Sequence, residues 1–509
     1  MCFFNNYKKI IDYVYYSAPT FSTEAILFKK LINLINENKK ILVYGDYDVD
    51  GAMCVKILTE SFKLIHYKNY DVYKYSNRTH SIDKGVIYQC VRGNYDAIII
   101  CDTGSSSVDL DKLHQLLDLK KQVIILDHHK TNLDYSDFPA NVAIINTTLE
   151  NKKLGYDFFK LSAGALCYCV MDKFLQKHFS CDCINLSAFA LTSLYADCMD
   201  MSNELNRSIY WRATGLSERE IPLILRRFIN EYTEFGKRYI EFWFAPRINA
   251  LFRTENFEIL NNYLFNEDIS SLSLSRIIDT IEEIYSVNRS LLDKISDIVN
   301  VEILNNFVLC NLMEIDSFVN VQSNKLYNYT GLLASKLTSR YNKTAIVYCQ
   351  NGSSIKGSVR DYYNRNLLDF FKTFCDAGGH PPAFGFFVNL FELTEFKNTI
   401  YMVDDNITKG IIKIGNSKKQ IVINHDVYKP DNSLITELAQ YNEFTGGDLP
   451  PVFVSKKFDE SIREIFRKGF SGYRYKWGDY YISSTYSLNK GCDYILKPVK
   501  KKSISFITQ

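Results

Sequence analysis

Residues 40–51 read KILVYGDYDVDG and decide the expected fold. The apolar run Lys40–Tyr44 is typical of a buried strand, and a helix is expected from Ala52 to about Leu64. Two more apolar runs of this kind follow, Tyr95–Cys101 and Gln122–Leu126, and Val142–Ile145 is a candidate fourth strand. Short apolar strands that alternate with helices predict an α/β fold with a parallel sheet and helices on both faces.

Acidic and histidine side chains follow these strands at the points where they end. In sheets of this type ligands bind at the carboxyl ends of the strands, so these side chains are expected to lie at one edge. A last acidic residue lies at the end of a helix expected over Ile184–Leu194. The set comprises Asp46, Asp48, Asp50, Asp102, Asp127, His128, His129 and Asp197.

Carboxylates placed this close repel one another unless a divalent cation neutralises them. The DYDVDG spacing imitates the start of a calcium-binding EF-hand loop, but Ile57 stands at its closing position and a strand precedes it, which excludes that site. Carboxylates and imidazoles without thiolates suit Mn²⁺ or Mg²⁺ better than structural zinc. Two such ions need a bridging carboxylate, and Asp102, in the middle element, is the best candidate. His129 is better placed to touch a phosphoryl oxygen than to bind an ion.

Composition places few restrictions on function. The chain has 509 residues, which suggests roughly three or four domains. Its net charge is +2, so a site for a polyanion must be a local patch. Its longest apolar runs are too short to span a membrane, and no secretory leader is expected. The 13 cysteines have no framework spacing, which indicates reduced thiols in a cytoplasmic protein.

Four segments are expected along the chain: a catalytic α/β domain over residues 1–260, a connecting helical segment over 261–300, a second α/β domain over 301–398 and a small β domain over 399–509. The helical spacing of apolar residues in Ser273–Asn300 predicts a long helix. In the second α/β domain, Phe307–Met313 and Thr344–Cys349 are expected strands. The last segment is rich in alternating patterns such as GIIKIG, KQIVIN and YYISSTY.

Taken together, the ordered motifs GDYDVDG, CDTGSSS, LDHHKT and ADCMDM resemble the four signature motifs of the DHH phosphoesterase superfamily. Further matches resemble its RecJ-like branch of single-strand-specific 5′→3′ exonucleases. These are Ser76-Asn77-Arg78, Asn206-Arg207, PRINA at 246–250 with Arg253, GSVR at 357–360 and GGH at 378–380. The resemblance runs from about Leu42 to Phe453 and becomes looser in FTGG and PPVF at its end.

The resemblance implies roles for individual residues. Asp46 and Asp48 would each bind one of two Mn²⁺ ions (Mg²⁺ being the alternative), Asp102 would bridge them, and His128 and Asp197 would complete the coordination. Asp50 and Asp127 would orient these ligands, and His129 would contact the scissile phosphate. Substrate contacts would come from Ser358 and Arg360 at the 5′-terminal phosphate, His380 near the nucleotide, and Arg78, Arg247, Asn249 and Arg253 along the strand. For each of these arginines, a surface salt bridge is an equally good interpretation.

Three departures from the family pattern concern the substrate end. Phe252 stands where the PRINA segment has a glycine, Asp361 places a negative charge beside the expected phosphate site, and Asp448-Leu449 replaces Asn-Pro. In the last segment, Tyr473, Tyr475, Trp477, Tyr480 and Tyr481, with Arg474 and Lys476, suit an OB-like domain that binds single strands, or are ordinary strand aromatics.

The sequence therefore predicts a metal-dependent single-stranded DNA exonuclease that acts 5′→3′ by a two-metal mechanism and releases 5′-mononucleotides in DNA repair, recombination or replication. We expect a monomer from a bacterial cell or its phage, with a single-strand-binding protein or a helicase as the kind of protein it would meet. One alternative is a DHH phosphodiesterase for short oligonucleotides or cyclic dinucleotides. Another is a non-catalytic repair scaffold, against which the complete set of metal ligands argues.

Overall fold

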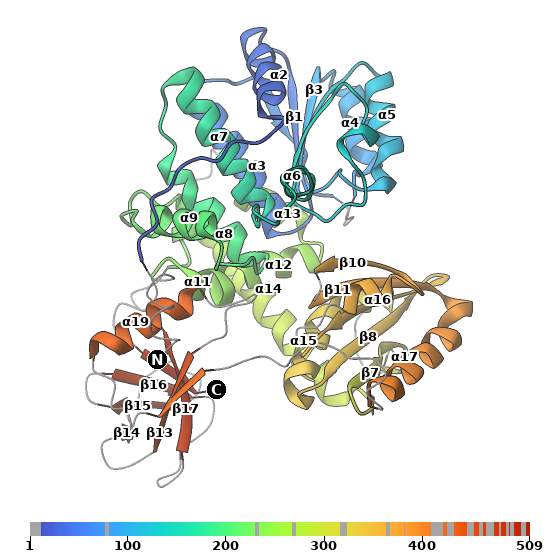
Figure 1. Ribbon diagram of the computed structural model, residues 1–509, viewed down its shortest axis with the longest axis vertical. Coiled ribbons are helices and arrows are strands. Elements are labelled where there is room, and N and C mark those ends of the chain that lie inside the picture. Colours follow the sequence, from blue (N-terminus) through green and yellow to red (C-terminus); the bar gives the residue numbers. More distant parts are fainter. Residues whose placement is uncertain are drawn as a thin grey trace. The chain divides into compact units, whose positions relative to one another are not determined.

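The computed structural model describes residues 12–76, 81–229, 234–266, 271–315, 323–362, 367–380, 382–408, 421–424, 432–444, 452–457, 462–464, 473–477, 480–484, 488, 493–499 and 505–508 (Figure 1). The chain divides into two compact units. Unit 1 comprises Met1–Ile277 together with Gln420–Gln509, and unit 2 comprises Ile278–Lys419. Among the described residues, no helix is long and apolar enough to cross a membrane.

The first sheet of unit 1 is parallel and has the order β2-β1-β3-β4-β5. Strands β1, β3 and β5 are buried along their whole length, and β4 along all but its first residue, which explains their continuous apolar sequence. The short edge strand β2 escaped sequence prediction because only three residues pair with β1. The strands are β1 (Ile41–Gly45), β2 (Tyr70–Val72), β3 (Ala97–Cys101), β4 (Gln122–Asp127) and β5 (Val142–Asn146).

Helices cover both faces of this sheet, as the sequence predicted. Helices α3, α7 and α8 pack against one another on one face, and α4 and α5 lie on the other (Figure 1). The helices around this sheet are α2 (Glu24–Asn36), α3 (Val49–Leu64), α4 (Lys84–Arg92), α5 (Leu110–Asp118), α6 (Thr147–Leu154), α7 (Ala163–Phe179), α8 (Ser187–Ala196) and α9 (Glu204–Thr214). Further along follow α10 (Leu223–Arg226), α11 (Lys237–Tyr239), α12 (Ala245–Arg253) and α13 (Phe257–Phe265).

The strand order reverses direction between β1 and β3, which is the point where doubly wound sheets bind their ligands. Asp46 follows β1 and Asp102 follows β3. The connection topology therefore brings the first two acidic motifs next to each other, although 56 residues separate them in the sequence.

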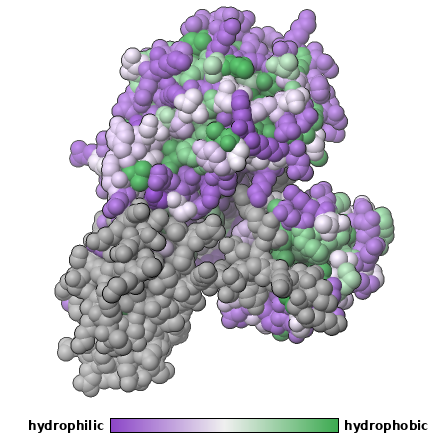
Figure 2. All heavy atoms as spheres, viewed as in Figure 1, coloured by the Kyte–Doolittle hydropathy of each residue, from purple (hydrophilic) through white to green (hydrophobic). Residues whose placement is uncertain are grey.

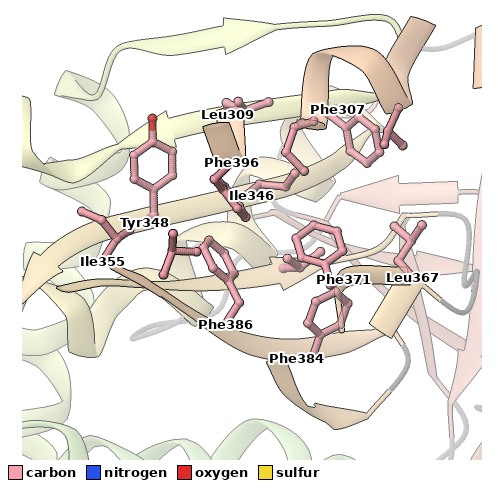
Figure 3. Packing of buried hydrophobic residues seen from close by; sticks show 14 of the residues in the cluster. Phe307, Leu309, Ile346, Tyr348, Ile355, Leu367, Phe371, Phe384, Phe386 and Phe396 are labelled. Atoms are coloured by element: carbon pink, nitrogen blue, oxygen red, sulfur yellow. The ribbon is translucent and has the colours of Figure 1, made fainter. Parts of the chain in front are cut away.

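Unit 2 contains a mixed six-stranded sheet of order β10-β11-β9-β8-β7-β6. Phe371, Phe384, Phe386 and Phe396 belong to the apolar core on one face of this sheet (Figure 3), and α15 packs against the other face. Its elements are β6 (Val301–Ile303), β7 (Phe307–Asn311), α15 (Thr330–Tyr341), β8 (Thr344–Asn351), β9 (Ser354–Arg360), α16 (Leu367–Phe371), β10 (Asp376–His380), β11 (Ala383–Asn389) and α17 (Leu393–Thr408). The predicted long helix is α14 (Ser271–Ile298), which begins in unit 1 and ends in unit 2.

The C-terminal part of unit 1 differs from the sequence prediction in two ways. The expected boundary at residue 399 falls inside α17, and a helix, α19 (Asn432–Glu443), lies within the segment expected to be strands. Its described strands form a seven-stranded order, β12-β13-β17-β18-β16-β15-β14, and whether it is OB-like stays a prediction. These strands are β12 (Ile421–Asn424), β13 (Val452–Lys457), β14 (Ile462–Glu464), β15 (Tyr473–Trp477), β16 (Tyr480–Ser484), β17 (Asp493–Val499) and β18 (Ser505–Thr508).

The aromatic residues proposed to bind single strands there are in part structural. Tyr475 and Trp477 on β15 are buried, and the hydroxyl of Tyr475 accepts a hydrogen bond from the backbone of Leu488 at 2.8 Å. These two side chains serve the core of the segment, as the plainer interpretation held. GIIKIG and Asp448-Leu449 lie outside the described residues.

Candidate metal centre

Helix α3 begins within the acidic motif that follows β1, and this fixes the positions of Asp48 and Asp50. Asp48 is the N-cap of α3, and its carboxylate accepts a hydrogen bond from the backbone of Gly51 at 3.0 Å. Asp50 lies in the first turn of that helix. The helix expected from Ala52 therefore begins earlier, at Val49. Gly51 is required because a Cβ atom there would lie 2.4 Å from the carbonyl oxygen of Asp46.

Asp102 occupies the centre of the site. Its backbone has a left-handed φ of 61°, which is unusual for a residue other than glycine and occurs at functional sites. The side chain is buried, and its Oδ1 atom has no hydrogen-bond donor among the described residues. Burial and the neighbouring charges of Asp50, Asp48 and Asp46 raise the pKa of Asp102 well above its usual range. A buried carboxylate in this position is stabilised by a cation.

Asp127 orients the histidine pair. Its Oδ1 atom accepts hydrogen bonds from the backbone of His128 at 2.8 Å and of His129 at 3.2 Å, and it lies 2.8 Å from Nδ1 of His129. Burial alone would lower the pKa of His129, but the Asp127 carboxylate outweighs it and raises that pKa to about 10. The His129 side chain is 45% exposed, so its cationic ring edge is open to a substrate.

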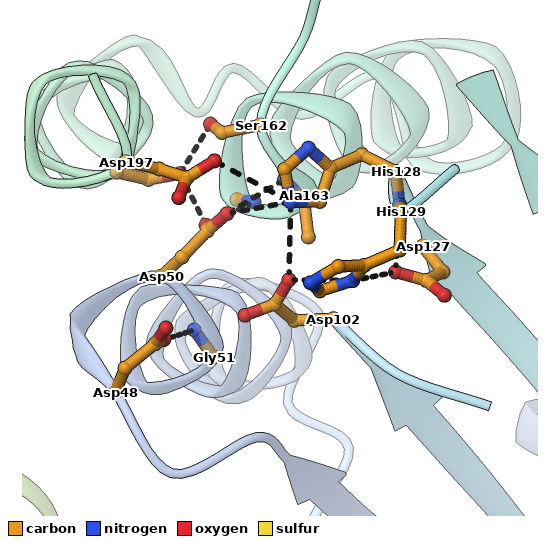
Figure 4. A network of polar contacts seen from close by, with 12 residues as sticks. Asp48, Asp50, Gly51, Asp102, Asp127, His128, His129, Ser162, Ala163 and Asp197 are labelled. Carbon is orange, nitrogen blue, oxygen red and sulfur yellow. Dashed lines mark hydrogen bonds and ion pairs between the residues drawn. The ribbon is translucent and has the colours of Figure 1, made fainter. Parts of the chain in front are cut away.

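His128 faces three carboxylates. Its Nε2 atom lies 3.4 Å from Asp102, 3.5 Å from Asp197 and 3.7 Å from Asp50 (Figure 4). Burial lowers the pKa of His128 despite these neighbours, which favours the neutral imidazole that binds metal ions.

Hydrogen bonds from helices α7 and α8 hold the Asp50 carboxylate in place. The backbone N–H groups of Ala163 and Gly164, at the N-terminus of α7, donate to its two oxygens at 2.9 and 2.8 Å, and the hydroxyl of Ser193 on α8 donates as well. A helix N-terminus stabilises such an anion. Burial nevertheless raises the pKa of Asp50 to about 6.

Three clusters among the described residues can hold a metal ion, with ligand atoms within 4.8 Å of one another. The first contains Asp46, Asp48 and Asp102, the second Asp102, His128 and His129, and the third Asp50, His128 and Asp197. Asp102 and His128 are each shared by two clusters. Seven of the eight predicted residues of the metal centre belong to these clusters, and the eighth, Asp127, contacts the two histidines. Oxygen and imidazole donors of this kind fit Mn²⁺ or Mg²⁺.

A supporting network was missed by sequence reasoning. The side-chain amide of Asn146 donates to Ser105 at 2.9 Å and to the backbone carbonyl of His129 at 3.0 Å. The Ser105 hydroxyl in turn donates to Asp127. Ser105 lies in CDTGSSS, and Asn146 directly follows the predicted fourth strand, so its place at a strand end was the available signal.

The basic residues expected along the strand have different surroundings. Arg78 lies outside the described residues. Arg247 is buried, donates to the Trp243 carbonyl at 2.8 Å and stacks over the Trp243 ring, so a contact with a nucleic-acid backbone would require this packing to open. Asn249 and Arg253 on the same helix are half-buried. Phe252, which replaces the glycine of the family pattern, packs against Tyr75 with ring centroids 4.9 Å apart.

In unit 2, Ser358 and Arg360 lie on one face of β9, next to the first residues of α15. Oγ of Ser358 is 2.9 Å from the hydroxyl of Thr330, and a Cβ atom at Gly331 would lie 2.9 Å from Nη2 of Arg360. Asp361 does not face this site, contrary to the sequence analysis. It is buried and accepts a hydrogen bond from Thr344 at 2.5 Å, because successive strand residues point to opposite faces.

The third substrate contact expected in unit 2 is His380, which ends β10. The structure describes its backbone, which pairs with Ala383 of β11. The expected contact of its side chain with the nucleotide stays a prediction.

Comparisons with known proteins identify similar chains. Residues 40–199 match the N-terminal domain of the DHH family. The chain is 24% identical over 386 residues to the single-stranded-DNA-specific exonuclease RecJ of Bacillus subtilis, which covers 73% of this chain and 46% of that protein. The chain thus spans about half the length of this curated relative.

Two solved structures have a similar fold. RecJ of Thermus thermophilus in complex with Mn²⁺ matches with a TM-score of 0.71 and 13% identity, covering 97% of this chain and 72% of that chain. The same protein in complex with Mg²⁺ matches with a TM-score of 0.63 and 12% identity, covering 97% and 70%. At these identities the likeness concerns the fold.

Proposed function

We propose that the chain, whose residues 40–199 match the N-terminal domain of the DHH family, is a RecJ-like nuclease that hydrolyses single-stranded DNA from its 5′ end. The likeness to the Bacillus exonuclease and to the Thermus fold supports the proposal. The observation that carries it is the pair of shared ligands, Asp102 and His128, which join three clusters into one centre.

In this proposal Asp46, Asp48, Asp102, His128 and Asp197 would hold two divalent ions, with Asp102 as the carboxylate common to two of the clusters. When bound, such ions supply Lewis-acid activation of water and neutralise charge on a phosphodiester. The chain prearranges this set: Asp102 is buried, and its neighbour Asp50 is buried and held in place by α7 and α8. Asp50 therefore orients its neighbours by hydrogen bonds and charge.

The half-exposed ring of His129 contacts the scissile phosphate. Asp127 occupies Nδ1, so the remaining ring nitrogen, Nε2, is the one that can donate to a phosphoryl oxygen. Because Asp127 keeps the ring protonated at neutral pH, His129 adds a positive charge where negative charge develops.

In unit 2, we assign the 5′-terminal phosphate to Ser358 and Arg360. A guanidinium suits a phosphate, and the adjacent N-terminus of α15 adds oriented N–H groups. Gly331 leaves space beside the Arg360 guanidinium, because a Cβ atom at Gly331 would lie 2.9 Å from Nη2 of Arg360. Asn249, Arg253, Arg78 and His380 are further proposed contacts of the strand.

The test is Mn²⁺-dependent digestion of a long single strand with a 5′-phosphate and a 3′-label, run beside a dinucleotide and a cyclic dinucleotide. We expect stepwise shortening from the 5′ end. Asp102→Asn abolishes it because the shared ligand is lost. Asp200→Asn is the matched control: Asp200 lies three residues from Asp197 but pairs with Lys160 at 2.9 Å, outside the clusters.

Two results would overturn the proposal. Hydrolysis of the short substrates with an intact long strand would assign the chain to the phosphodiesterases of short oligonucleotides. Tight binding of the strand without cleavage of any substrate, in the presence of Mn²⁺, would identify a scaffold.

A further inference from the structure

Tyr75 lies beside the metal centre but belongs to none of its metal-binding clusters. Hydrophilic and hydrophobic side chains are interspersed on the described surface that Figure 2 shows, whereas Tyr75 is in the interior, with only 3% of its surface exposed. It directly precedes Ser76-Asn77-Arg78, one of the motifs that resemble the RecJ-like branch. The side chain therefore reaches the centre from a segment that contributes none of the predicted metal ligands.

One aromatic ring and one amide fix the position of Tyr75. Its ring packs against that of Tyr47, which stands between Asp46 and Asp48 in the acidic motif, with ring centroids 5.1 Å apart. Its backbone N–H donates to Oδ1 of Asn261 on α13 at 3.0 Å, and its carbonyl accepts from Nδ2 of the same side chain at 3.0 Å. The ring is therefore held next to the turn that carries the first two carboxylates.

Phe252 completes this packing and is a departure from the family pattern. It stands where the PRINA segment has a glycine, and its ring centroid lies 4.9 Å from that of Tyr75. A glycine offers no side chain against which a ring can pack, so the phenylalanine supplies a support that the family pattern lacks. Phe252 is itself buried, and exclusion of water from both rings stabilises the contact. The departure thus serves to hold Tyr75 in place.

The hydroxyl of Tyr75 is a buried donor that has no hydrogen-bond partner among the described residues. Burial raises the pKa of Tyr75 well above its usual range, and the charges of Asp48 and Asp46 raise it further, so the hydroxyl keeps its proton. These two carboxylates influence Tyr75 more strongly than any other charged neighbour. The O–H group is therefore available as a donor close to the cluster of Asp46, Asp48 and Asp102.

A phenylalanine at position 75 would make the same ring contacts without burying a hydroxyl. Tyr73, two residues earlier, uses its hydroxyl within the fold, because it donates to Asp83 at 3.0 Å. Buried hydroxyls are nearly always hydrogen-bonded, and one that is not costs folding free energy unless a ligand supplies the acceptor. The tyrosine at position 75 is therefore explained by an acceptor that enters the site together with an ion.

We propose that Tyr75 is a positioning residue of the metal centre, whose hydroxyl donates a hydrogen bond to a water molecule retained by an ion at Asp46, Asp48 and Asp102. An ion such as Mg²⁺ keeps several waters when carboxylates bind it, and a water is small enough to reach a buried hydroxyl. Phe252 keeps the ring where this contact is possible. This role of Tyr75 rests on the proposed function, because it assumes that the cluster holds an ion.

The experiment measures the Kd of Mn²⁺ for the full chain by titration calorimetry, together with the Tm with and without the ion. Tyr75→Phe removes only the hydroxyl. We expect its Tm without Mn²⁺ to equal or exceed that of the wild type, because the lost group has no partner in the described structure. We expect its Kd to rise roughly three- to tenfold, the effect of one hydrogen bond. A tyrosine with a purely structural role would change the Tm and leave the Kd unchanged.

Tyr73→Phe is the matched control. It also removes one hydroxyl from a tyrosine of the same segment, but this hydroxyl is bonded to Asp83, so the Tm falls and the Kd for Mn²⁺ stays at the wild-type value. Phe252→Leu displaces the Tyr75 ring without removing its hydroxyl. It is expected to raise the Kd in the wild-type background and to have no further effect on the Kd in a Tyr75→Phe background. Phe252→Leu alone decides the question if Tyr75→Phe does not fold.

A Kd of Tyr75→Phe equal to that of the wild type would overturn the role of Tyr75, while the proposed function would stand if the wild type shortens long single strands from the 5′ end. An effect of Phe252→Leu that persists in the Tyr75→Phe background would overturn the role of Phe252. If the wild type neither binds Mn²⁺ nor cleaves any strand, the proposed function fails and the role of Tyr75 with it.

Discussion

Binding of Mn²⁺ is expected to depend steeply on pH, because the ion must displace protons from the site. Burial raises the pKa of Asp50 from 3.8 to about 6, and burial with neighbouring carboxylates raises that of Asp102 further above its usual range. A group with a pKa of 6 is about 90% protonated at pH 5 and about 10% protonated at pH 7. His128 does not compete, because its pKa is lowered and the ring is already neutral over this range.

The direction of this pH dependence follows from the preference of the ion for deprotonated carboxylates. An ion binds the deprotonated carboxylates, so its affinity falls as pH falls through the raised pKa values. Protonation of Asp50, which neighbours the ligands, contributes at most about a tenfold loss of affinity between pH 7 and pH 5, and the raised pKa of the ligand Asp102 adds to it. The Kd for Mn²⁺, measured by titration calorimetry in two buffers of different ionisation enthalpy, reports the affinity and the protons released together.

Asp102→Asn is the control for this experiment. It removes the shared ligand and the group with the most strongly raised pKa, so both the affinity and the proton release fall. A Kd that is equal at pH 5 and pH 7, with no proton release, would falsify the assignment of the cluster as the metal centre. Carboxylates that stay ionised at pH 5 would then be held by contacts other than a cation.

Three further outcomes are expected. Gly51→Ala loses the increase in Tm caused by Mn²⁺, because its Cβ would lie 2.4 Å from the Asp46 carbonyl, and a normal increase would contradict this packing. Asn146→Asp keeps the capping acceptor of α6 but not the amide donors, so kcat falls roughly tenfold with Tm preserved, whereas an unchanged kcat would exclude a positioning role. Asp361→Ala lowers the free energy of unfolding by about 1–3 kcal/mol through the lost Thr344 bond without changing the preference for a 5′-phosphate in a competition assay.

The sequence predicted the parallel sheet because its central strands are buried on both faces and therefore apolar throughout. It also predicted that the acidic motifs meet, because strand ends of a parallel sheet share an edge. It did not predict the early start of α3, although an aspartate before an apolar run is a recognised helix start, and Asp48 is that N-cap. The alternation of Ser358, Arg360 and Asp361 along one strand was likewise available and would have turned Asp361 away from the phosphate site.

Other features depend on contacts that no local pattern reports. The anchoring of Asp50 joins residues 113 positions apart, through backbone N–H groups that carry no side-chain signature. The seven-stranded order in the C-terminal part of unit 1 includes parallel pairs such as β16 with β18, which turn signals cannot specify.

The anchoring of Asp50 also explains how a site made of strand ends can be both charged and rigid. Both Asp50 oxygens are already engaged by N–H and O–H donors, and this satisfies the carboxylate without an ion. Among the described residues, Asp102 has no hydrogen-bond donor at Oδ1 and carries the more strongly raised pKa, so its charged form gains most from a nearby cation. A cation is therefore drawn to Asp102, which two of the three clusters share, while Asp48 and Asp50 keep their positions through backbone N–H groups of α3 and α7. The difference between a carboxylate already held by hydrogen bonds and a central carboxylate with a strongly raised pKa favours cation binding at Asp102 over binding at Asp50.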